Sequence, residues 1–579
     1  MQFHACQYAM KAGREAFLLV AGCALLYLTG AGAIPFYTRG EPREGLVVRE
    51  MIRTGAWLVP ARPEGEPARK PPLYYWLAAA ALRTVPERPE LALRLPSATF
   101  ASAAVLGTWA TARAVWGSRA GLPAALVLAT AFEWTRAATS ARVDMTLAAA
   151  LTAVLGSWTL ALAGRGRWWA ALAAAGMVLG TLAKGPVALV LPALAAAALA
   201  ATRGDLRPLR PLAALAAAAA VAAAWYAVAF LREGGAFLEV VLRENWFRFV
   251  DAERGTTGHA HHLLYLLPVG LVGLLPWTPI IPLALVPLRA APRAPAAALA
   301  AAWVVTGLVF FALAAAKRSV YLLPLYPALA LLVGAGIAAG PIGGRLGRVI
   351  RLGAALYAPA ALLLVALAGA LAVGIDAGGL LRDTLRPADA AGAVALIETA
   401  RSVRAVLVIL AGATLAAVPL LLGAVRRESW RRLVVVVAAL FVAWTASFDA
   451  LLHPAIARTR SLRGFFALVS RELPAEAPLY ALFPPDPGLR FYAPRTLAPW
   501  PPRGAARGGY LLLWEDEWRR LRDAAGRPLG VLAVSEANQP GRGHLALVVA
   551  PAGPLVPARD GDPAVPAGPP GFRMGSRPR

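Results

Sequence analysis

Residues 69–77 read Arg-Lys-Pro-Pro-Leu-Tyr-Tyr-Trp-Leu, which places two cations and two prolines directly before a short aromatic and apolar segment. This segment ends near residue 82, so it is shorter than the roughly 20 residues that a spanning helix needs. We therefore predict a helix that lies along a membrane surface. The two prolines restrict the backbone directly after Lys70. A lysine that only extends its side chain to the interface does not require such a restriction. The aromatic residues Tyr74, Tyr75 and Trp76 can equally form an interfacial belt.

The whole chain has the composition of a polytopic membrane protein. Hydrophobic residues make up 59% and charged residues 16% of its 579 positions, which excludes an ordinary soluble globular chain. Long apolar runs recur along the chain, and we predict about 13 transmembrane helices from them. The runs lie at 16–34, 93–112, 120–135, 145–163, 168–183, 186–202, 211–231, 263–288, 295–315, 319–340, 353–375, 403–425 and 433–452.

Arginines gather in alternate gaps between these runs. The pattern follows the positive-inside rule, so we expect a cytoplasmic N-terminus and place the residues after about 453 on the opposite, periplasmic face. This rule explains the formal net charge of +26, since the basic residues orient the helices in the membrane. We therefore expect no nucleic-acid partner. The gaps concerned include Lys11 and Arg14, Arg113 and Arg119, Arg345, Arg348 and Arg351, and Arg426, Arg427, Arg431 and Arg432.

The other gaps also carry acids, histidines and aromatics, and we expect the chemistry on their side of the membrane. The longest are 35–92, in which we predict interfacial helices, and the loop 232–262. We assign 1–453 to a helical transmembrane domain and 454–550 to a small periplasmic α/β or α+β domain. Residues 551–579, rich in Pro, Gly and Arg, are predicted to be a disordered tail. The predicted fold class is an all-α polytopic membrane protein with a small soluble domain.

Short motifs follow one another through the first part of the chain. They are Gly40-Glu41-Pro42-Arg43, Lys70-Pro71-Pro72-Leu73, Arg94-Leu95-Pro96-Ser97, Ala141-Arg142-Val143-Asp144, Lys184-Gly185-Pro186, Arg243-Glu244-Asn245, Arg248-Phe249, Gly258-His259, Leu275-Pro276-Trp277 and Lys317-Arg318 with Tyr321. The ordered set resembles the GT-C membrane glycosyltransferases that take sugars from polyprenyl phosphates. It is most similar to the lipid A aminoarabinose transferase (ArnT) type, which is related to the protein O-mannosyltransferases.

The resemblance implies a GT-C helical bundle and an inverting transfer of a sugar from a polyprenyl-phosphate donor. The acceptor it implies is lipid A-like or another envelope lipid, glycan or protein, at the periplasmic face of a bacterial inner membrane. It implies no cofactor and no catalytic metal, although three histidines, His259, His261 and His262, leave a metal as an alternative. A protein O-mannosyltransferase-like enzyme also fits the motifs, and a transporter or flippase of lipid-linked substrates is a rival class. A transporter predicts ionisable residues near the middle of several helices, which the apolar runs lack.

The cations at the outer ends of the helices suit such a donor on physical grounds. A polyprenyl phosphate keeps its tail in lipid and its anionic head at the interface, where lysine and arginine can contact it. These donors would stabilise the negative charge that grows on the departing phosphate. We expect Lys70 and Lys317 to approach one phosphate together, with Lys184 as a further candidate.

Two carboxylates, Glu41 and Asp144, are candidates for the base that takes a proton from an acceptor hydroxyl. The resemblance implies an Asp-Glu-x-Arg pattern whose Asp is catalytic, and Arg43 aligns with its arginine. Gly40 then stands at the position of the Asp. Either Glu41 replaces that residue, or Asp144 serves, or an acceptor that is itself a phosphate needs no base.

The resemblance and the charges together give one predicted set of substrate contacts. The set consists of Arg43, Lys70, Tyr74, Arg142, Lys184, Arg243, Arg248, His259, Lys317, Arg318 and Tyr321.

Overall fold

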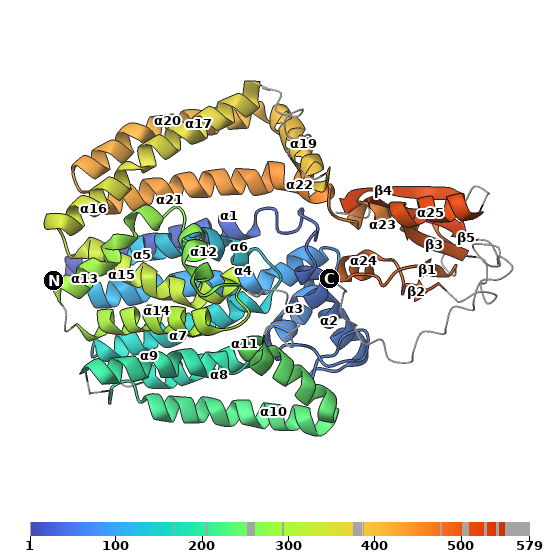
Figure 1. Cartoon of the computed structure of the whole chain (residues 1–579). Coiled ribbons are helices and arrows are strands. Elements are labelled where there is room, and N and C mark those ends of the chain that lie inside the picture. The colour runs from blue at the N-terminus through green and yellow to red at the C-terminus, as the bar shows by residue number, and fades with distance from the viewer. Residues whose placement is uncertain are drawn as a thin grey trace. The chain divides into compact units, whose positions relative to one another are not determined.

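The computed structural model describes residues 2–166, 168–203, 206–251, 261–291, 294–373, 385, 387–474, 477–500, 509–525, 530–539 and 543–550. The chain divides into two units, Met1–Ser461 and Leu462–Arg579. The first unit contains the long helices, and the second contains the sheet (Figure 1).

The first unit is a bundle in which many helices run side by side (Figure 1). Its elements up to residue 250 are α1 (Gln2–Leu28), α2 (Gly40–Thr54), α3 (Leu73–Thr84), α4 (Pro89–Trp116), α5 (Ser118–Ala129), α6 (Phe132–Ala138), α7 (Val143–Leu162), α8 (Trp169–Lys184), α9 (Val187–Arg203), α10 (Pro211–Val241), the π-helical η1 (Leu242–Phe247) and α11 (Arg248–Val250). They are followed by η2 (Leu263–Tyr265), α12 (Leu266–Gly273), η3 (Thr278–Leu285), α13 (Val286–Ala290), α14 (Pro295–Leu313), η4 (Ser319–Leu325), α15 (Tyr326–Ala338), α16 (Gly344–Ala355), α17 (Tyr357–Val373), α19 (Pro387–Ser402), α20 (Arg404–Arg426), α21 (Trp430–Ser447), η5 (Phe448–Leu452) and α22 (His453–Arg458).

Eight helices of the described residues are long and apolar enough to cross a membrane, or nine if the bent pair Leu263–Gly273 and Thr278–Ala290 is one span. The multi-pass helical bundle is therefore confirmed, whereas the prediction of about 13 spans is not. Three predicted runs form shorter apolar helices, Ser118–Ala129, Trp169–Lys184 and Val187–Thr202. The 16 residues of α8 extend only about 24 Å, below the roughly 30 Å of a bilayer core.

The centre of the first unit is formed by α7 and by the continuous η4 and α15. In their most apolar windows, 83% of Val143–Leu162 and 94% of Ser319–Ala338 is buried, against 22% of Pro211–Phe247. Small residues allow close approach there, since a Cβ on Gly334 of α15 would lie 2.7 Å from the carbonyl oxygen of Ala120 on α5. Glycine and alanine pack helices together in membranes in this way.

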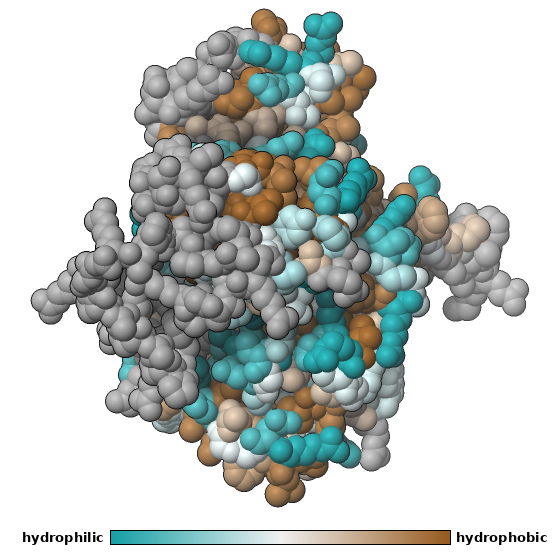
Figure 2. Space-filling view, turned by 90° about the vertical axis from the view of Figure 1, so that its right-hand side faces the viewer, coloured by the Kyte–Doolittle hydropathy of each residue, from teal (hydrophilic) through white to brown (hydrophobic). Residues whose placement is uncertain are grey.

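The outer surface of the first unit exposes large apolar side chains. Leu212, Leu231 and Val373 are 82%, 82% and 84% exposed. Figure 2 shows apolar residues in brown on the face that it displays, interrupted by polar residues in teal. An apolar outside around a closely packed helical interior is stable in a bilayer, where backbone polar groups must be satisfied within the helices.

Two short helices, α2 and α3, lie between α1 and α4, in the segment predicted to hold interfacial helices. α2 is followed by Gly55, whose φ of 72° is the left-handed conformation that favours glycine. α3 begins directly after Pro72 and buries Leu73, Tyr74 and Tyr75. Proline is tolerated there because the first N–H groups of a helix have no partner within it. The start of α3 thus fixes the backbone that carries Lys70.

The segment 232–262, predicted as a loop, is helical as far as Val250. α10 passes through a break at Gly234, whose φ of 59° and ψ of −137° are not helical, and then continues to Val241. Glycine adopts such angles at little cost, so the chain turns and resumes its helix where the sequence pattern predicted an end. Residues 252–260, with His259, lie outside the described residues.

The second unit contains a five-stranded sheet in the order β2-β1-β3-β5-β4. β1 pairs in parallel with β2 and β3, whereas β5 pairs antiparallel with β3 and β4. Its elements are α23 (Arg463–Glu472), β1 (Leu479–Ala481), α24 (Pro487–Tyr492), β2 (Ala498–Pro499), β3 (Gly509–Trp514), α25 (Glu515–Ala525), β4 (Val531–Gln539) and β5 (Gly543–Ala550). Phe466 and Val469 of α23 share a buried cluster with Leu547 of the sheet. A small C-terminal sheet region is thus confirmed.

The division between the units follows Ser461, later than the predicted boundary at 453 and 454. The reason is that the segment after α21 is bonded into the first unit. Ser461 Oγ donates to the carbonyl of Phe36 at 2.8 Å, and Arg460 forms an ion pair with Asp389 at 2.6 Å. The predicted tail, 551–579, lies outside the described residues.

Candidate functional site

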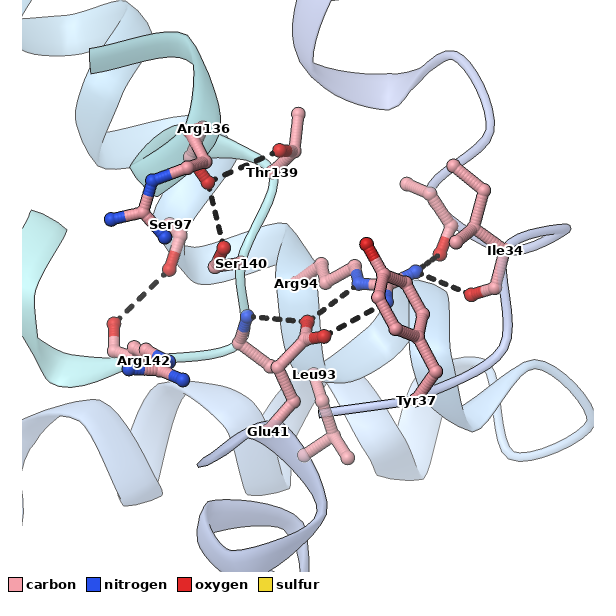
Figure 3. Close-up of polar contacts among 12 residues, drawn as sticks. Ile34, Tyr37, Glu41, Leu93, Arg94, Ser97, Arg136, Thr139, Ser140 and Arg142 are labelled. Atoms are coloured by element: carbon pink, nitrogen blue, oxygen red, sulfur yellow. Dashed lines mark hydrogen bonds and ion pairs between the residues drawn. The ribbon is translucent and has the colours of Figure 1, made fainter. Parts of the chain in front are cut away.

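A buried ion pair joins α2 to α4 (Figure 3). Arg94 Nε donates to Glu41 Oε1 at 2.8 Å, and Arg94 Nη2 donates to Oε2 at 3.1 Å. Arg94 Nη1 donates to the carbonyls of Ala31 and Ile34 at 2.8 and 2.6 Å. The backbone N–H of Ala141 donates to Glu41 Oε1 at 3.0 Å. Glu41 and Arg94 therefore connect the segment after α1, the first part of α4 and the segment that leads into α7.

These contacts determine the protonation of Glu41. Burial alone raises the pKa of this carboxyl, but the charge and hydrogen bonds of Arg94, then the Ala141 N–H and the Arg142 charge, leave the pKa below its ordinary value of 4.5. Glu41 is thus an ionised carboxylate with both oxygens engaged by Arg94. A general base needs an oxygen within reach of the proton that it removes, whereas Glu41 accepts from Arg94 through one oxygen and from Arg94 and the Ala141 N–H through the other.

Arg142, the residue before α7, packs against Gly40 at the start of α2. A Cβ on Gly40 would lie 2.1 Å from Nη2 and 2.5 Å from Cζ of Arg142. The guanidinium therefore occupies the space that a side chain at position 40, the expected place of a catalytic Asp, would need. Within the described part of the chain the Arg142 side chain makes no hydrogen bond, since only its carbonyl accepts one, from Ser97 Oγ (Figure 3). Its donors are available to a ligand.

Arg142 borders a small polar pocket, the charged pocket, of about 40 Å³. That volume holds on the order of three water molecules, a space of anion size. Six basic and three acidic side chains give the lining an excess of three positive charges, which favours a negatively charged ligand. The lining consists of Arg43, Glu44, Arg69, Lys70, Arg142, Val143, Asp144, Lys184, Glu244, Arg318 and Tyr321.

Two lysines of the charged pocket are held by carboxylates that are distant in sequence. Lys70 Nζ lies 2.7 Å from Glu244 Oε2, with the two side chains 12% and 4% exposed. Lys184 Nζ lies 2.5 Å from Asp144 Oδ1, with side chains 13% and 12% exposed. The Lys184 ammonium also lies 5.3 Å from the ring centroid of Tyr321, a cation–π distance. Each ammonium is therefore fixed in place before a ligand arrives.

The third carboxylate, Glu44, is held by α2 and α3. Arg43 Nη2 donates to Glu44 Oε1 at 2.7 Å, and the Tyr75 hydroxyl donates to Oε2 at 2.7 Å. Burial, followed by the charge of Glu44, raises the pKa of Tyr75 well above its ordinary value, so this hydroxyl stays protonated and donates. Every carboxylate of the charged pocket thus accepts a hydrogen bond from a neighbouring side chain.

The position of Lys184 depends on the glycine that follows it. α8 ends at Lys184, and Gly185 has a φ of 92°, which favours glycine. A Cβ there would also lie 2.7 Å from the hydroxyl oxygen of Tyr226. The Lys-Gly-Pro motif therefore ends the helix with its last ammonium directed at Asp144.

The charged pocket adjoins an apolar cavity of about 400 Å³. The two share Lys70, Lys184, Glu244 and Tyr321. The rest of the cavity wall is almost wholly apolar: Leu147, Pro186, Val187, Val190, Val241, Leu242, Asn245, Trp246, Phe249, Phe310, Phe311, Ala314, Ala316, Val320 and Pro324. A cationic end joined to a hydrocarbon-lined space suits an amphipathic anion, with its charged head in one part and its chain in the other.

Most of the predicted site residues meet at the charged pocket. They are Arg43, Lys70, Arg142, Asp144, Lys184, Arg318 and Tyr321. Tyr74 is fully buried and donates to the carbonyl of Leu93 at 2.8 Å, and Arg243 forms an exposed ion pair with Glu239. Neither lines the charged pocket. The side chain of Arg248 and all of His259 lie outside the described residues.

Lys317 is the main departure from the predicted arrangement. Its ammonium donates to the carbonyl oxygens of Ala314 at 2.7 Å and His261 at 3.0 Å. It thereby satisfies the carbonyl of Ala314 just after α14 and that of His261 before η2. Its neighbour Arg318, in an extended conformation before η4, is the residue that lines the charged pocket. Lys317, predicted to approach one phosphate together with Lys70, does not line the charged pocket, and the two lysines that line it are Lys70 and Lys184.

Three charged residues that line the charged pocket were not predicted as site residues, namely Glu44, Arg69 and Glu244. Glu244 belongs to the Arg243-Glu244-Asn245 motif. Its position between the candidate cations Arg243 and Arg248 was the one feature of the sequence that could have indicated it. Its contact with Lys70 spans 174 residues of sequence, which spacing alone does not reveal. No group of three His, Cys, Asp or Glu residues that could hold a metal occurs among the described residues, and His259 is not one of these.

The comparisons with known proteins agree with this geometry. Residues 69–228 match the family model of the dolichyl-phosphate-mannose-protein mannosyltransferases. The crystal structure of ArnT from Cupriavidus metallidurans in the apo state gives a TM-score of 0.72 at 21% identity, covering 95% of this chain and 100% of that one. The structure of ArnT from the same organism bound to undecaprenyl phosphate gives 0.70 at 21% identity, covering 94% and 99%. No curated protein matches the chain in sequence.

The agreement in fold with ArnT extends over nearly the full length of both chains. The chain therefore has the fold of ArnT, the GT-C fold that its motifs predict, and carries in residues 69–228 the pattern of the dolichyl-phosphate-mannose-protein mannosyltransferases.

Proposed function

We propose that this chain is an inverting membrane glycosyltransferase that moves a sugar from a polyprenyl phosphate to an acceptor at the periplasmic face. The observation that carries the proposal is the junction of the charged pocket with the apolar cavity. An excess of three positive charges adjoins an apolar space of about 400 Å³, which matches a phosphate head and the first part of an isoprenoid chain. The positive-inside pattern supports the periplasmic orientation.

The donor phosphate is proposed to bind between Lys70, Lys184, Arg142 and Arg318. Lysine offers a compact charge, and arginine a planar pair of donors that fits phosphate oxygens. When the bond between the anomeric carbon and the phosphate oxygen breaks, the electron pair stays on the phosphate. The cations stabilise that charge without moving, because Glu244 and Asp144 already hold the two ammonium groups. A phosphate leaving group with this support needs no general acid.

The acceptor is proposed to be an anion, such as the phosphate of a lipid A-like molecule. All three carboxylates of the charged pocket accept hydrogen bonds from neighbouring side chains, as Glu41 does behind it. A phosphate oxygen is already ionised, so it attacks the anomeric carbon with no proton to remove. Of the three hypotheses for the base, the geometry thus supports the absence of an essential one.

A protein hydroxyl is the second candidate acceptor, which the match of residues 69–228 to protein mannosyltransferases favours. A hydroxyl must lose its proton during attack. Asp144 lines the charged pocket and is the carboxylate that would take the proton, after release from Lys184.

The test uses the purified full-length chain in lipid nanodiscs with undecaprenyl-phosphate-linked sugars of defined structure. A lipid A-like acceptor is supplied with its phosphate and, in a parallel sample, after enzymatic removal of the phosphate; a Ser- and Thr-rich peptide is the third acceptor. We expect transfer to the phosphorylated lipid alone. Transfer to the peptide would support the second candidate, and no transfer from any donor to any acceptor would contradict the proposed function. Arg345→Gln changes an exposed arginine on α16 that does not line the charged pocket, so we expect this variant to transfer as the wild type does.

A further inference from the structure

We propose that the chain holds the headgroup of an anionic phospholipid in a second pocket, the arginine pocket, remote from the charged pocket. This site has a volume of about 830 Å³. It is lined by Arg119, Ile337, Gly340, Pro341, Arg426, Arg427, Glu428, Ser429, Trp430, Arg431, Arg432 and Val435. Five of these residues are arginines and one is acidic, and nothing in the proposed transfer reaction uses them.

The arginine pocket lies at the other end of the bundle. α4 has 28 residues and therefore a length of about 42 Å. Arg94 near its start is bonded to Glu41 beside the charged pocket, whereas Arg119 follows its end. From Arg94 to the end of α4 at Trp116 the helix rises about 33 Å, which is comparable to the roughly 30 Å hydrocarbon core of a bilayer. If the charged pocket lies at the headgroups of one leaflet, the arginine pocket lies at those of the other, which the positive-inside pattern makes the cytoplasmic leaflet.

Most of the charge in the arginine pocket is not neutralised by the protein. Arg431 forms an ion pair with Glu15 at 3.1 Å. Glu428 forms an ion pair at 2.7 Å with Arg351, which does not line the arginine pocket. The other four arginines make no ion pair or side-chain hydrogen bond within the described ranges: Arg119, Arg426, Arg427 and Arg432. Like charges held together repel one another, and a phosphodiester that accepts from two guanidinium groups relieves that repulsion.

The turn between α20 and α21 fixes four of the arginines in one place. Glu428 has a φ of 51°, a left-handed conformation that non-glycine residues seldom adopt. The turn is closed by the N–H of Ser429, which donates to the carbonyl of Ala424 at 2.8 Å, and by the ion pair of Glu428 with Arg351. It therefore presents the last residues of α20 and the first turn of α21 to a single ligand. This arrangement exists before the ligand binds.

The apolar part of the arginine pocket indicates a lipid as the source of the phosphate. Ile337 and Trp430 are 9% and 4% exposed and form apolar wall, and Val435 is 39% exposed. Leu420 and Leu422 on α20 are 52% and 39% exposed, so apolar side chains continue along this helix. A free phosphate ion has no contact to make with these side chains. A diacyl phospholipid places its phosphodiester on the arginines and its chains along the helices.

The test measures the thermal unfolding of the full-length chain in a neutral detergent as lipid is added. The probes are phosphatidylglycerol, phosphatidylcholine and inorganic phosphate. The triple variant Arg426→Gln/Arg427→Gln/Arg432→Gln is compared with Arg345→Gln/Arg348→Gln, which removes two exposed arginines of α16 outside the pocket. We expect saturable stabilisation of the wild type by phosphatidylglycerol. We also expect an apparent affinity at least about 30-fold weaker in the triple variant, and an unchanged one in the control.

Three outcomes would overturn the proposal. They are equal stabilisation by phosphatidylcholine, equal stabilisation by inorganic phosphate alone, and an unchanged phosphatidylglycerol affinity in the triple variant. If the triple variant does not fold, native mass spectrometry of the wild type decides: retention of phosphatidylglycerol in preference to phosphatidylcholine supports the site, and equal retention overturns it. None of these readouts depends on sugar transfer, so the proposed function can fail while this site stands.

Discussion

Replacing Glu41 by glutamine separates a positioning carboxylate from a catalytic base. Glutamine keeps the shape of the side chain and can still accept from the Ala141 N–H through its Oε1. Its amide nitrogen, however, is a donor and faces the Nη2 donor of Arg94, which now lies 3.1 Å from Glu41 Oε2. The substitution therefore removes a buried charge from one side of an ion pair and leaves the guanidinium without its counter-ion.

The expected loss of folding free energy is large. Both side chains are buried, with Glu41 6% and Arg94 4% exposed, and removal of one partner of a buried pair costs about 3–5 kcal/mol. Replacing both partners, as in Glu41→Gln/Arg94→Met, leaves no unpaired charge, so we expect the double variant to lose less than the sum of the single variants. Glu50→Gln on the same helix, where Glu50 pairs with the exposed Arg53, is the control and should change little.

The effect of Glu41→Gln also depends on pH. Because the pKa of Glu41 is lowered in the folded chain, its carboxylate stabilises the fold at pH values above the ordinary pKa of 4.5. That contribution is lost as the pH falls through the lowered pKa. The difference in stability between wild type and Glu41→Gln should be largest at neutral pH and should shrink below about pH 4.5.

The assays are the thermal midpoint in detergent and the transfer rate per folded molecule. A positioning pair predicts that Glu41→Gln and Arg94→Met lose stability and activity together. A general base contributes about 10²–10⁴-fold in rate. If Arg94→Met keeps stability and transfer while Glu41→Gln folds normally and loses transfer by such a factor, Glu41 is the base and the positioning argument is refuted.

Three further substitutions test the arrangement of the site. Gly40→Ala places a Cβ 2.1 Å from Arg142 Nη2, so the guanidinium must move; we expect at least about tenfold weaker binding of undecaprenyl phosphate by isothermal titration, and unchanged affinity would mean that Arg142 does not contact the ligand. Lys317→Met removes the donor that the carbonyls of Ala314 and His261 share. We expect the thermal midpoint to fall, with a loss of about 1–3 kcal/mol in folding free energy, and the affinity for undecaprenyl phosphate to stay the same. An unchanged thermal midpoint with weaker binding of undecaprenyl phosphate would mean that Lys317 contacts the donor. Val190→Trp narrows the apolar cavity. It should weaken the binding of undecaprenyl phosphate at least about tenfold and the binding of a short-chain isoprenyl phosphate much less. Equal losses of affinity for the two lipids would mean that the isoprenoid chain binds elsewhere.

The features that the sequence predicts well are those that depend on local pattern. Apolar runs and prolines near helix ends predict the bundle and the start of α3, and motifs at helix ends predict that Arg142, Asp144 and Arg318 share one region. The number of spans is not predictable in this way, because a run such as that of α8 is apolar whether or not it crosses a bilayer.

The features that the sequence does not predict depend on tertiary contacts. Lys317 and Arg318 are neighbours of the same charge, yet one satisfies carbonyls near the end of α14 and the other lines the charged pocket. Lys184 was a candidate from its motif, but its ion pair with Asp144 depends on the packing of α8 beside α7. Similarly, the missing carboxylate at Gly40 is visible in sequence, but the guanidinium that fills its place is not.

The most direct test of the central claim is the affinity of the full-length chain for undecaprenyl phosphate in the variant Arg142→Gln. The Arg142 side chain makes no hydrogen bond among the described residues, so its removal should leave the fold intact, as the thermal midpoint would verify. Loss of a charge-assisted contact, about 1.5–3 kcal/mol, predicts affinity weaker by roughly 10- to 150-fold, with no change in Arg345→Gln. An Arg142→Gln protein that binds undecaprenyl phosphate as tightly as the wild type would contradict the claim that the charged pocket holds the lipid phosphate.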